Sequence, residues 1–423
     1  MKVVIMAGGK GTRISSVASD IPKPMIKIEN VPVLEREILN LKKQGFTDII
    51  LTVSHLGQII MDYFKDGKDF GVNIKYYNEV TPLGNAGALF KIKDDLKEDF
   101  LLLNGDAIFD IDFNRFVKYH KEKGGLVTLF THPNSHPYDS GLIITDEDNK
   151  VLRWLNKEDE RPEFYNNLVN AGLHVISPKL LEKQIDKEKI DLDRDLLKPL
   201  AGTGLMYSYK SSEYVKDMGT PDRYASVCDD FRNGRVEAKN LCNKQKAIFL
   251  DRDGTINKSV GFLNDINKLE LIDDAAKAIK KINDNGYLAI VITNQPIIAR
   301  GEATIEELDL IHKKLETLLG FEHAYIDGLY YCPHHPDKGF VGERIEYKIK
   351  CECRKPAPGL ILKAQADFNI DLENSYMIGD QKMDVLCGKN AKCKTGYIGP
   401  NNEFDADIYG TSLYDVVNKI FGE

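Results

Sequence analysis

The sequence lacks any apolar stretch long enough to cross a bilayer, and it lacks a block of consecutive lysines or arginines. Its first residues alternate like a β-strand instead of forming a basic segment before a long apolar run, so no secretory signal is expected. The net charge of -8 gives no electrostatic footprint for nucleic acid or an anionic membrane. We therefore expect a cytoplasmic protein that acts on small molecules; its oligomeric state is not indicated.

Cysteine is too scarce and too unevenly spaced for a disulfide framework, because the chain has seven, an odd number. Cys332, Cys351 and Cys353 lie near two histidines. This grouping favours a metal site in a reducing compartment over disulfides. The other four cysteines show no pattern.

The length of 423 residues exceeds one ordinary hydrophobic core, so two domains are expected. Each half begins with a short β-branched strand, then a turn rich in glycine and charge, then an amphipathic helix and another strand, which is typical of parallel α/β sheets. We expect an α/β fold class with two Rossmann-like domains: residues 1–233, a polar linker at 234–245, and residues 246–423.

Hydrophobic periodicity predicts helices at corresponding places in the two halves. The first covers residues 33–45 and precedes a buried strand at 48–53. The second has Asp273 or Asp274 as its capping residue and precedes a strand at 287–293. A last helix in the first half is expected at residues 223–231.

A glycine-rich loop, AGGKGTR, follows the first strand. Gly8, Gly9 and Gly11 allow backbone N–H groups to approach a phosphate without a Cβ in the way. Such a turn alone is most often only a tight connection. Here it continues into Arg13 and then PKPM, where two prolines stiffen the segment that carries Lys23. Two cations beside a glycine cradle suit a triphosphate.

The combination GGxGTR and PKP resembles the sugar-1-phosphate nucleotidyltransferases over about the first 230 residues, which implies a GT-A-like fold. The turn TPLGNAGAL resembles the base-reading turn of that family, with Asn85 where threonine is usual. The resemblance implies that the nucleotide is bound by Gly8, Gly9, Gly11, Thr12, Arg13, Lys23, Pro82, Leu83 and Gly84.

Asp106 and Asp217 end strand-like segments within motifs of the same family. The resemblance implies that they hold Mg²⁺, which prefers oxygen ligands and phosphate. It also implies a sugar site at Gly141, Glu158 and Asn170. Catalysis would consist of positioning and charge neutralisation by Lys23, Arg13 and Mg²⁺, without a protein nucleophile.

The second half contains the segment DRDGT directly after a strand. Asp251 and Asp253 are two residues apart, so in an extended segment their side chains point the same way. One can attack phosphorus while the other protonates the leaving oxygen and later activates water. Thr293 at the next strand end and Lys355 in RKP would complete the site.

The ordered set DRDGT, TNQ, RKP and MIGDQKMD resembles the haloacid dehalogenase (HAD) superfamily of phosphatases, from about residue 246 to 399. It implies a HAD-like fold with Mg²⁺ held by Asp251, Asp253 and Asp380, and with Asp384 as a further ligand. The short spacing between the motifs leaves no room for a large cap domain.

Two ligand pairs, C-x-H in YYCPHHP and C-x-C in CECRKP, predict a closed structural Zn²⁺ site made by Cys332, His334, Cys351 and Cys353. The alternative is a reduced cluster of buried cysteines. With the HAD motifs, these segments resemble D-glycero-D-manno-heptose-1,7-bisphosphate 7-phosphatases; the histidinol phosphatases share the zinc pattern.

The two resemblances describe consecutive steps. The first domain looks most like the heptose-1-phosphate guanylyltransferases, so we expect GTP and heptose phosphates as substrates, GDP-heptose as product, Mg²⁺ in both domains and Zn²⁺ in the second. Two alternatives stay open. One is a hexose-1-phosphate uridylyl- or thymidylyltransferase fused to a phosphatase of other specificity, such as one for histidinol phosphate. The other is a non-catalytic sugar-nucleotide sensor with an active phosphatase.

Overall fold

The structure, a computed structural model, describes residues 1–423 except 9–19, 55, 82, 184, 340 and 423. The described chain divides into two compact units. The first contains residues 1–132, 141–155 and 169–240, and the second contains 133–140, 156–168 and 241–423. Residues 234–245 include a short helix, α6 (Arg235–Ala238).

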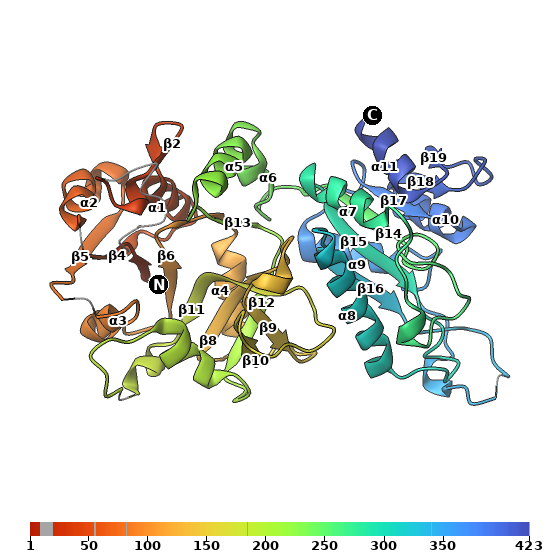
Figure 1. Cartoon of the computed structure of the whole chain (residues 1–423), viewed down its shortest axis with the longest axis horizontal. Coiled ribbons are helices and arrows are strands. Elements are labelled where there is room, and N and C mark those ends of the chain that lie inside the picture. Colours follow the sequence, from red (N-terminus) through yellow and green to blue (C-terminus); the bar gives the residue numbers. More distant parts are fainter. Residues whose placement is uncertain (9–19, 55, 82, 184, 340, 423) are drawn as a thin grey trace. The chain divides into compact units, whose positions relative to one another are not determined.

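The first unit is built on a nine-stranded sheet (Figure 1). Its main path runs β10-β9-β11-β6-β1-β4-β5, and β8 joins β11 to β12. Strands β1, β4, β5 and β6 are mutually parallel, whereas β11 runs antiparallel to β6. The strands are β1 (Val3–Met6), β4 (Asp48–Val53), β5 (Asn73–Asn78), β6 (Phe100–Asn104), β8 (Val127–His132), β9 (Leu142–Thr145), β10 (Val151–Leu155), β11 (Val169–Ile176) and β12 (Met206–Lys210).

Two small ribbons accompany this sheet: β2 (Lys27–Ile28) with β3 (Val31–Pro32), and β7 (Ala107–Asp110) with β13 (Tyr214–Asp217). The expected helix over 33–45 is α1 (Val33–Lys43), whose buried stripe of Leu34, Ile38 and Leu41 packs into the core. The other helices of this unit are α2 (Gly57–Phe64), α3 (Gly87–Lys91), α4 (Phe113–Lys123) and α5 (Pro221–Arg232), which is the expected last helix.

The second unit has a six-stranded parallel sheet in the order β16-β15-β14-β17-β18-β19 (Figure 1). Parallel neighbours require crossover connections, which the helices supply. The elements are β14 (Ala247–Leu250), α7 (Ala275–Asp284), β15 (Leu288–Asn294), α8 (Ile305–Phe321), β16 (Gly328–Cys332), α9 (Gly359–Phe368), β17 (Tyr376–Gly379), α10 (Lys382–Asn390), β18 (Lys394–Ile398), β19 (Ile408–Gly410) and α11 (Leu413–Phe421). The α/β fold class is therefore confirmed in both units.

The predicted side-chain cap of α7 is wrong. Asp274 is the N-cap residue, but its backbone has φ 63° and its side chain makes no capping hydrogen bond. The carboxylate instead pairs with Lys277 Nζ at 2.7 Å. An aspartate can adopt this left-handed conformation, and there its side chain no longer faces the first turn of the helix.

Helix α8 carries the two early segments that belong to the second unit. The buried carboxylate of Glu316 accepts hydrogen bonds from the backbone N of Asn167 at 2.7 Å and from Asn166 Nδ2 at 3.1 Å. Thr317 Oγ1 accepts from the backbone N of Tyr165 at 3.0 Å. Asn167 in turn binds the backbone of Asn134, so that residues 133–140 and 156–168 form one layer on the helix.

In the part of the chain that is described, no helix is both long enough and apolar enough to cross a membrane.

Candidate active sites

A cavity of about 650 Å³ opens at the carboxyl ends of β1, β4 and β6. Ligands commonly bind at this edge of α/β sheets, because loops diverge there from a rigid base. The described residues that line it are Met6, Ala7, Gly8, Lys23, Pro24, Thr52, Ser54, Glu79, Val80, Gly84, Asn85, Asn104 and Asp106.

Lys23 and Asp106 form the charged pair of this cavity. Lys23 lies in a short 3-10 turn (Lys23–Met25), is 8% exposed, and donates from Nζ to Asp106 Oδ2 at 2.9 Å. Asp106 keeps 43% of its side chain exposed. The pair therefore offers a cation for phosphate and a carboxylate for a metal at one wall.

Asp217 is brought next to Asp106 by the β7–β13 ribbon, in which Asp217 pairs with Ala107. Its carboxylate accepts from Arg223 Nη1 at 2.6 Å. The two aspartates predicted to hold Mg²⁺ are thus close along the ribbon and partly exposed. Partly exposed carboxylates fit a hard cation that is shared with substrate phosphates.

The expected nucleotide-binding residues Gly9, Gly11, Thr12, Arg13 and Pro82 lie outside the described residues. Of the others, Gly8 lines the cavity beside Ser54, whose hydroxyl donates to the carbonyl oxygen of Gly8.

Gly84 also lines the cavity, with φ 81°. A Cβ there would lie 2.3 Å from the carbonyl oxygen of Ile190, so only glycine fits. Leu83 is held next to it, since its carbonyl oxygen accepts from the backbone N of Ile190 at 2.8 Å.

Glu79 is a cavity residue that the sequence interpretation missed. It follows β5, and burial raises the pKa of its carboxyl group. The available signal was its place after a predicted strand and immediately before the base-reading turn. An acidic side chain at such a strand end is well placed to bind a ligand.

The expected sugar residues are only partly brought together. Val169 of β11 pairs with Leu142 of β9, so the antiparallel register puts Asn170 opposite Gly141. Glu158 is exposed and lies in the segment 156–168 of the second unit.

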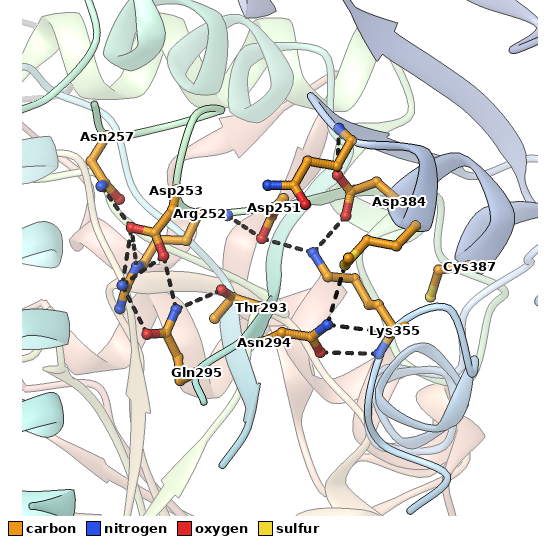
Figure 2. Close-up of polar contacts among 12 residues, drawn as sticks. Asp251, Arg252, Asp253, Asn257, Thr293, Asn294, Gln295, Lys355, Asp384 and Cys387 are labelled. Atoms are coloured by element: carbon orange, nitrogen blue, oxygen red, sulfur yellow. Dashed lines mark hydrogen bonds and ion pairs between the residues drawn. The ribbon is translucent and has the colours of Figure 1, made fainter. Parts of the chain in front are cut away.

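The second candidate site lies at the carboxyl ends of β14, β15 and β17 (Figure 2). Lys355 Nζ lies 2.7 Å from Asp251 Oδ1 and 2.6 Å from Asp384 Oδ1, and all three side chains are at most 10% exposed. Burial alone would lower the pKa of Lys355, but the two carboxylates outweigh it and raise the pKa. The ammonium therefore stays charged at neutral pH.

Asn294 fixes the backbone of this lysine. Its Oδ1 accepts from the backbone N of Lys355 at 3.0 Å, and its Nδ2 donates to the carbonyl oxygen of Lys355 at 3.2 Å (Figure 2). The sequence interpretation chose the preceding Thr293 and missed Asn294. The signal was its position in the same TNQ motif.

Asp253 lies in a separate polar cluster (Figure 2). Arg252, fully buried, donates from Nη2 to both carboxylate oxygens at 2.8 and 3.0 Å. Asn257 and Gln295 each donate to the carboxylate at 2.9 Å. Burial would raise the pKa of Asp253, but these partners outweigh it and lower the pKa. Gln295 Nε2 also donates to Thr293 Oγ1 at 2.8 Å, which orients that hydroxyl.

Three carboxylates of this unit could hold a metal ion. One oxygen each of Asp251, Asp380 and Asp384 lies within 4.8 Å of the others, and Asp253 is not among them. Asp380 Oδ1 is buried without a hydrogen-bond partner. Burial and the charge of Asp251 raise the pKa of Asp380 to about 6. Gly254 leaves the space, since a Cβ there would lie 2.2 Å from Asp380 Oδ2. Crowded, unpartnered oxygens of this kind fit Mg²⁺.

The four predicted zinc ligands converge. The sulfur atoms of Cys332, Cys351 and Cys353 are 3.2 to 3.5 Å apart, and His334 Nδ1 lies 3.3 Å from Cys353 Sγ. Tetrahedral Zn²⁺ with bonds of about 2.3 Å to sulfur needs contacts only slightly longer than these. His335 is directed elsewhere, because its Nδ1 accepts from the backbone N of Asp337.

Comparisons with known proteins agree with this division. The nucleotidyl transferase family matches residues 2–233, and a HAD-hydrolase-like family matches residues 352–401. A UTP–glucose-1-phosphate uridylyltransferase of Synechocystis sp. is 35% identical over 54% of this chain and 62% of its own length. The chain thus spans less than two thirds of that relative.

Two further relatives cover more of their own length. A mannose-1-phosphate guanyltransferase of Debaryomyces hansenii is 31% identical over 58% of this chain and 69% of its own length. A D-glycero-β-D-manno-heptose-1,7-bisphosphate 7-phosphatase of Haemophilus ducreyi is 38% identical over 41% of this chain and 97% of its own length. The chain therefore belongs to the nucleotidyl transferase family through its first half and to the HAD-like phosphatases through its second half.

Proposed function

We propose that this chain is a bifunctional enzyme of activated heptose synthesis. The second unit removes the 7-phosphate of D-glycero-D-manno-heptose 1,7-bisphosphate. The first unit then transfers GMP from GTP to the heptose 1-phosphate, giving GDP-heptose and pyrophosphate. The observation that carries the proposal is one chain with both a Lys23–Asp106 cavity and a buried Asp251–Lys355–Asp384 cluster.

The phosphatase step follows from the residues of the second unit. Asp251 attacks phosphorus, the bond to the leaving sugar oxygen breaks, and Asp253 delivers a proton to that oxygen. Asp253 then takes a proton from water, which attacks phosphorus and releases Asp251. Lys355 neutralises charge, and Thr293 can donate to a phosphate oxygen. Mg²⁺, when bound by Asp251 and Asp380, supplies further charge neutralisation.

The transferase step needs no covalent enzyme intermediate. An oxygen of the sugar 1-phosphate attacks the α-phosphorus, and the bond to pyrophosphate breaks. Lys23 is held by Asp106 within the cavity and can stabilise the charge that develops on the phosphate oxygens. Asp106 and Asp217 would hold the Mg²⁺ that bridges the two phosphates.

Guanine is supported by the chemistry of Glu79. A carboxylate accepts hydrogen bonds through both oxygens, and guanine presents two adjacent donors, N1–H and the 2-amino group. Uracil presents a single ring N–H on the corresponding edge. A phosphatase unit that resembles heptose bisphosphate phosphatases supports a heptose phosphate as the partner substrate.

The zinc site has a structural role in this proposal, because four protein ligands leave no position for substrate. Its reduced thiolates and the use of nucleoside triphosphates support a cytoplasmic location.

The decisive experiment is mass spectrometry of the products formed from heptose 1,7-bisphosphate, Mg²⁺ and a mixture of the common nucleoside triphosphates. We expect inorganic phosphate, pyrophosphate and GDP-heptose. Loss of phosphate without any nucleotide sugar would contradict the transferase half, whereas unchanged bisphosphate would contradict the phosphatase half.

A second candidate is uridylyl transfer to a hexose 1-phosphate, which the 35% identity to the Synechocystis uridylyltransferase favours. Specificity constants for UTP with glucose 1-phosphate and for GTP with heptose 1-phosphate, measured on the same preparation, separate the two. A higher constant for the UTP pair would replace the guanylyl assignment.

A further inference from the structure

Asn85 lines the nucleotide cavity but uses only one end of its side-chain amide within the protein. Its Oδ1 accepts a hydrogen bond from the backbone N of Leu192 at 2.7 Å. A backbone N–H can only donate, so this contact decides which end of the amide is the oxygen. Among the described residues, Nδ2 has no hydrogen-bond partner, and the side chain is exposed to the cavity.

The turn that carries Asn85 is fixed on both sides. The backbone N of Ala86 donates to the carbonyl oxygen of Ile190 at 3.0 Å, and Ile190 donates to Leu83 at 2.8 Å. The close approach of Gly84 to Ile190 leaves no room for movement in that direction.

The segment on the other side of these contacts is itself anchored. Leu192 begins a π-helical turn (Leu192–Leu197) in which Leu192, Leu196 and Leu197 are buried. Asp191 caps this turn, because its side chain accepts from the backbone N of Arg194 at 2.8 Å. The amide of Asn85 is therefore held in one orientation before any ligand arrives, which preorganises Nδ2 as a donor.

We propose that Asn85 Nδ2 donates a hydrogen bond to the edge of the nucleotide base, and so selects bases that present an acceptor there. Guanine offers O6 and N7, and uracil offers O4, whereas adenine and cytosine place an amino donor at the corresponding position. Two donors facing each other leave both unpaired, which disfavours the amino bases. This inference rests on the proposed nucleotidyl transfer and adds a specificity determinant to it.

The test is Asn85→Asp, which keeps the shape and the acceptor for Leu192 but replaces the donor by a second acceptor. We expect KM for GTP to rise about tenfold to a hundredfold, with kcat changed by less than a factor of about three. The ratio of specificity constants for ATP over GTP, and for CTP over GTP, should rise. The matched control is Asn78→Asp, which adds the same charge at an exposed position that does not line the cavity.

The outcomes are distinct. If the parent enzyme releases no pyrophosphate with any triphosphate and sugar phosphate, the proposed function fails. If the parent is active but Asn85→Asp leaves the base ratios at the parent values, or if Asn78→Asp changes them equally, the role of Asn85 is wrong.

A substrate-side measurement keeps the test valid if the variant does not fold. The parent enzyme is assayed with 7-deaza-GTP, which lacks the N7 acceptor, and with 6-thio-GTP, which has a weak acceptor at position 6; 4-thio-UTP serves if UTP is preferred. We expect at least one analogue to lose about tenfold in kcat/KM relative to the natural nucleotide. Equal constants for every analogue would overturn the inference.

Discussion

Lys355 Nζ lies 2.7 Å from Asp251 Oδ1 in a site where the lysine side chain is only 1% exposed. Asp384 faces the same ammonium group at 2.6 Å from the other side. The lysine therefore compensates two buried carboxylates, one of which is the proposed nucleophile. It holds the charge balance of the site before a phosphate arrives and can share its charge with the phosphate afterwards.

We expect Lys355→Met to lower the phosphatase kcat by about a hundredfold to a thousandfold, because it removes a preorganised cation at the reacting phosphate. Phosphate release from the bisphosphate measures this. Lys280→Met, on the exposed face of α7, is the control and should keep parent activity. A variant Lys355→Met with parent kcat would exclude Lys355 from the reaction.

We expect one Zn²⁺ per chain in protein purified without chelators, because three thiolates and an imidazole favour zinc over Mg²⁺. Cys351→Ser should lose the metal, lower the melting temperature and then reduce phosphatase activity, since Cys353 is only two residues from Lys355. Elemental analysis and thermal unfolding measure both effects. Cys242→Ser, at an exposed cysteine outside the cluster, should change neither; absence of zinc from the parent protein would contradict the assignment.

Local patterns were enough to predict the strands and helices that position the sites. The stripe of Leu34, Ile38 and Leu41 predicted α1, and the ordered strand-end motifs predicted that Asp251 and Lys355 meet. Parallel strands present their carboxyl ends at one edge, so residues distant in sequence could be assigned to one place.

Contacts made by loops were not predictable in the same way. Glu79 faces the nucleotide cavity and Asn294 fixes Lys355, but neither stands out in composition or spacing. The packing of residues 156–168 on α8 depends on Glu316 and Thr317, about 150 positions later in the chain. Hydrophobic periodicity carries no information about such polar, long-range contacts.

Acid should destabilise the first unit through His174. This residue of β11 is 1% exposed, pairs in the sheet with Leu102 and Leu129, and neither ring nitrogen has a hydrogen-bond partner. Burial lowers the pKa of His174 to about 3. The unfolded chain binds a proton below about pH 6.5 while the folded chain does not, so stability falls as the pH falls from about 6.5 towards 3.

We expect His174→Leu to remove this loss, amounting to about 1.4 kcal/mol of unfolding free energy at pH 5.5 relative to pH 7.5. Urea unfolding followed by the fluorescence of Trp154, the single tryptophan and part of β10 in the same unit, measures it. His323→Asn changes an exposed histidine and is the control. Equal pH dependence in His174→Leu and the parent would show that His174 is not the responsible group.

The two active sites should be separable by single substitutions. Asp251→Asn keeps the shape of the side chain but cannot supply an anionic nucleophile, so phosphate release from heptose 1,7-bisphosphate should fall to background. The same variant, given heptose 1-phosphate and GTP, should form GDP-heptose at close to the parent rate, because Lys23 and Asp106 belong to the other unit.

Asp106→Asn is the reciprocal change. It weakens a Mg²⁺ ligand and the partner of Lys23, so pyrophosphate release should stop while 7-phosphate hydrolysis continues at the parent rate. Each variant serves as the folding control of the other, since each retains one activity in the same chain. If either substitution abolished both reactions in protein that remained folded, the two steps would depend on one another, and the assignment of two independent sites would be wrong.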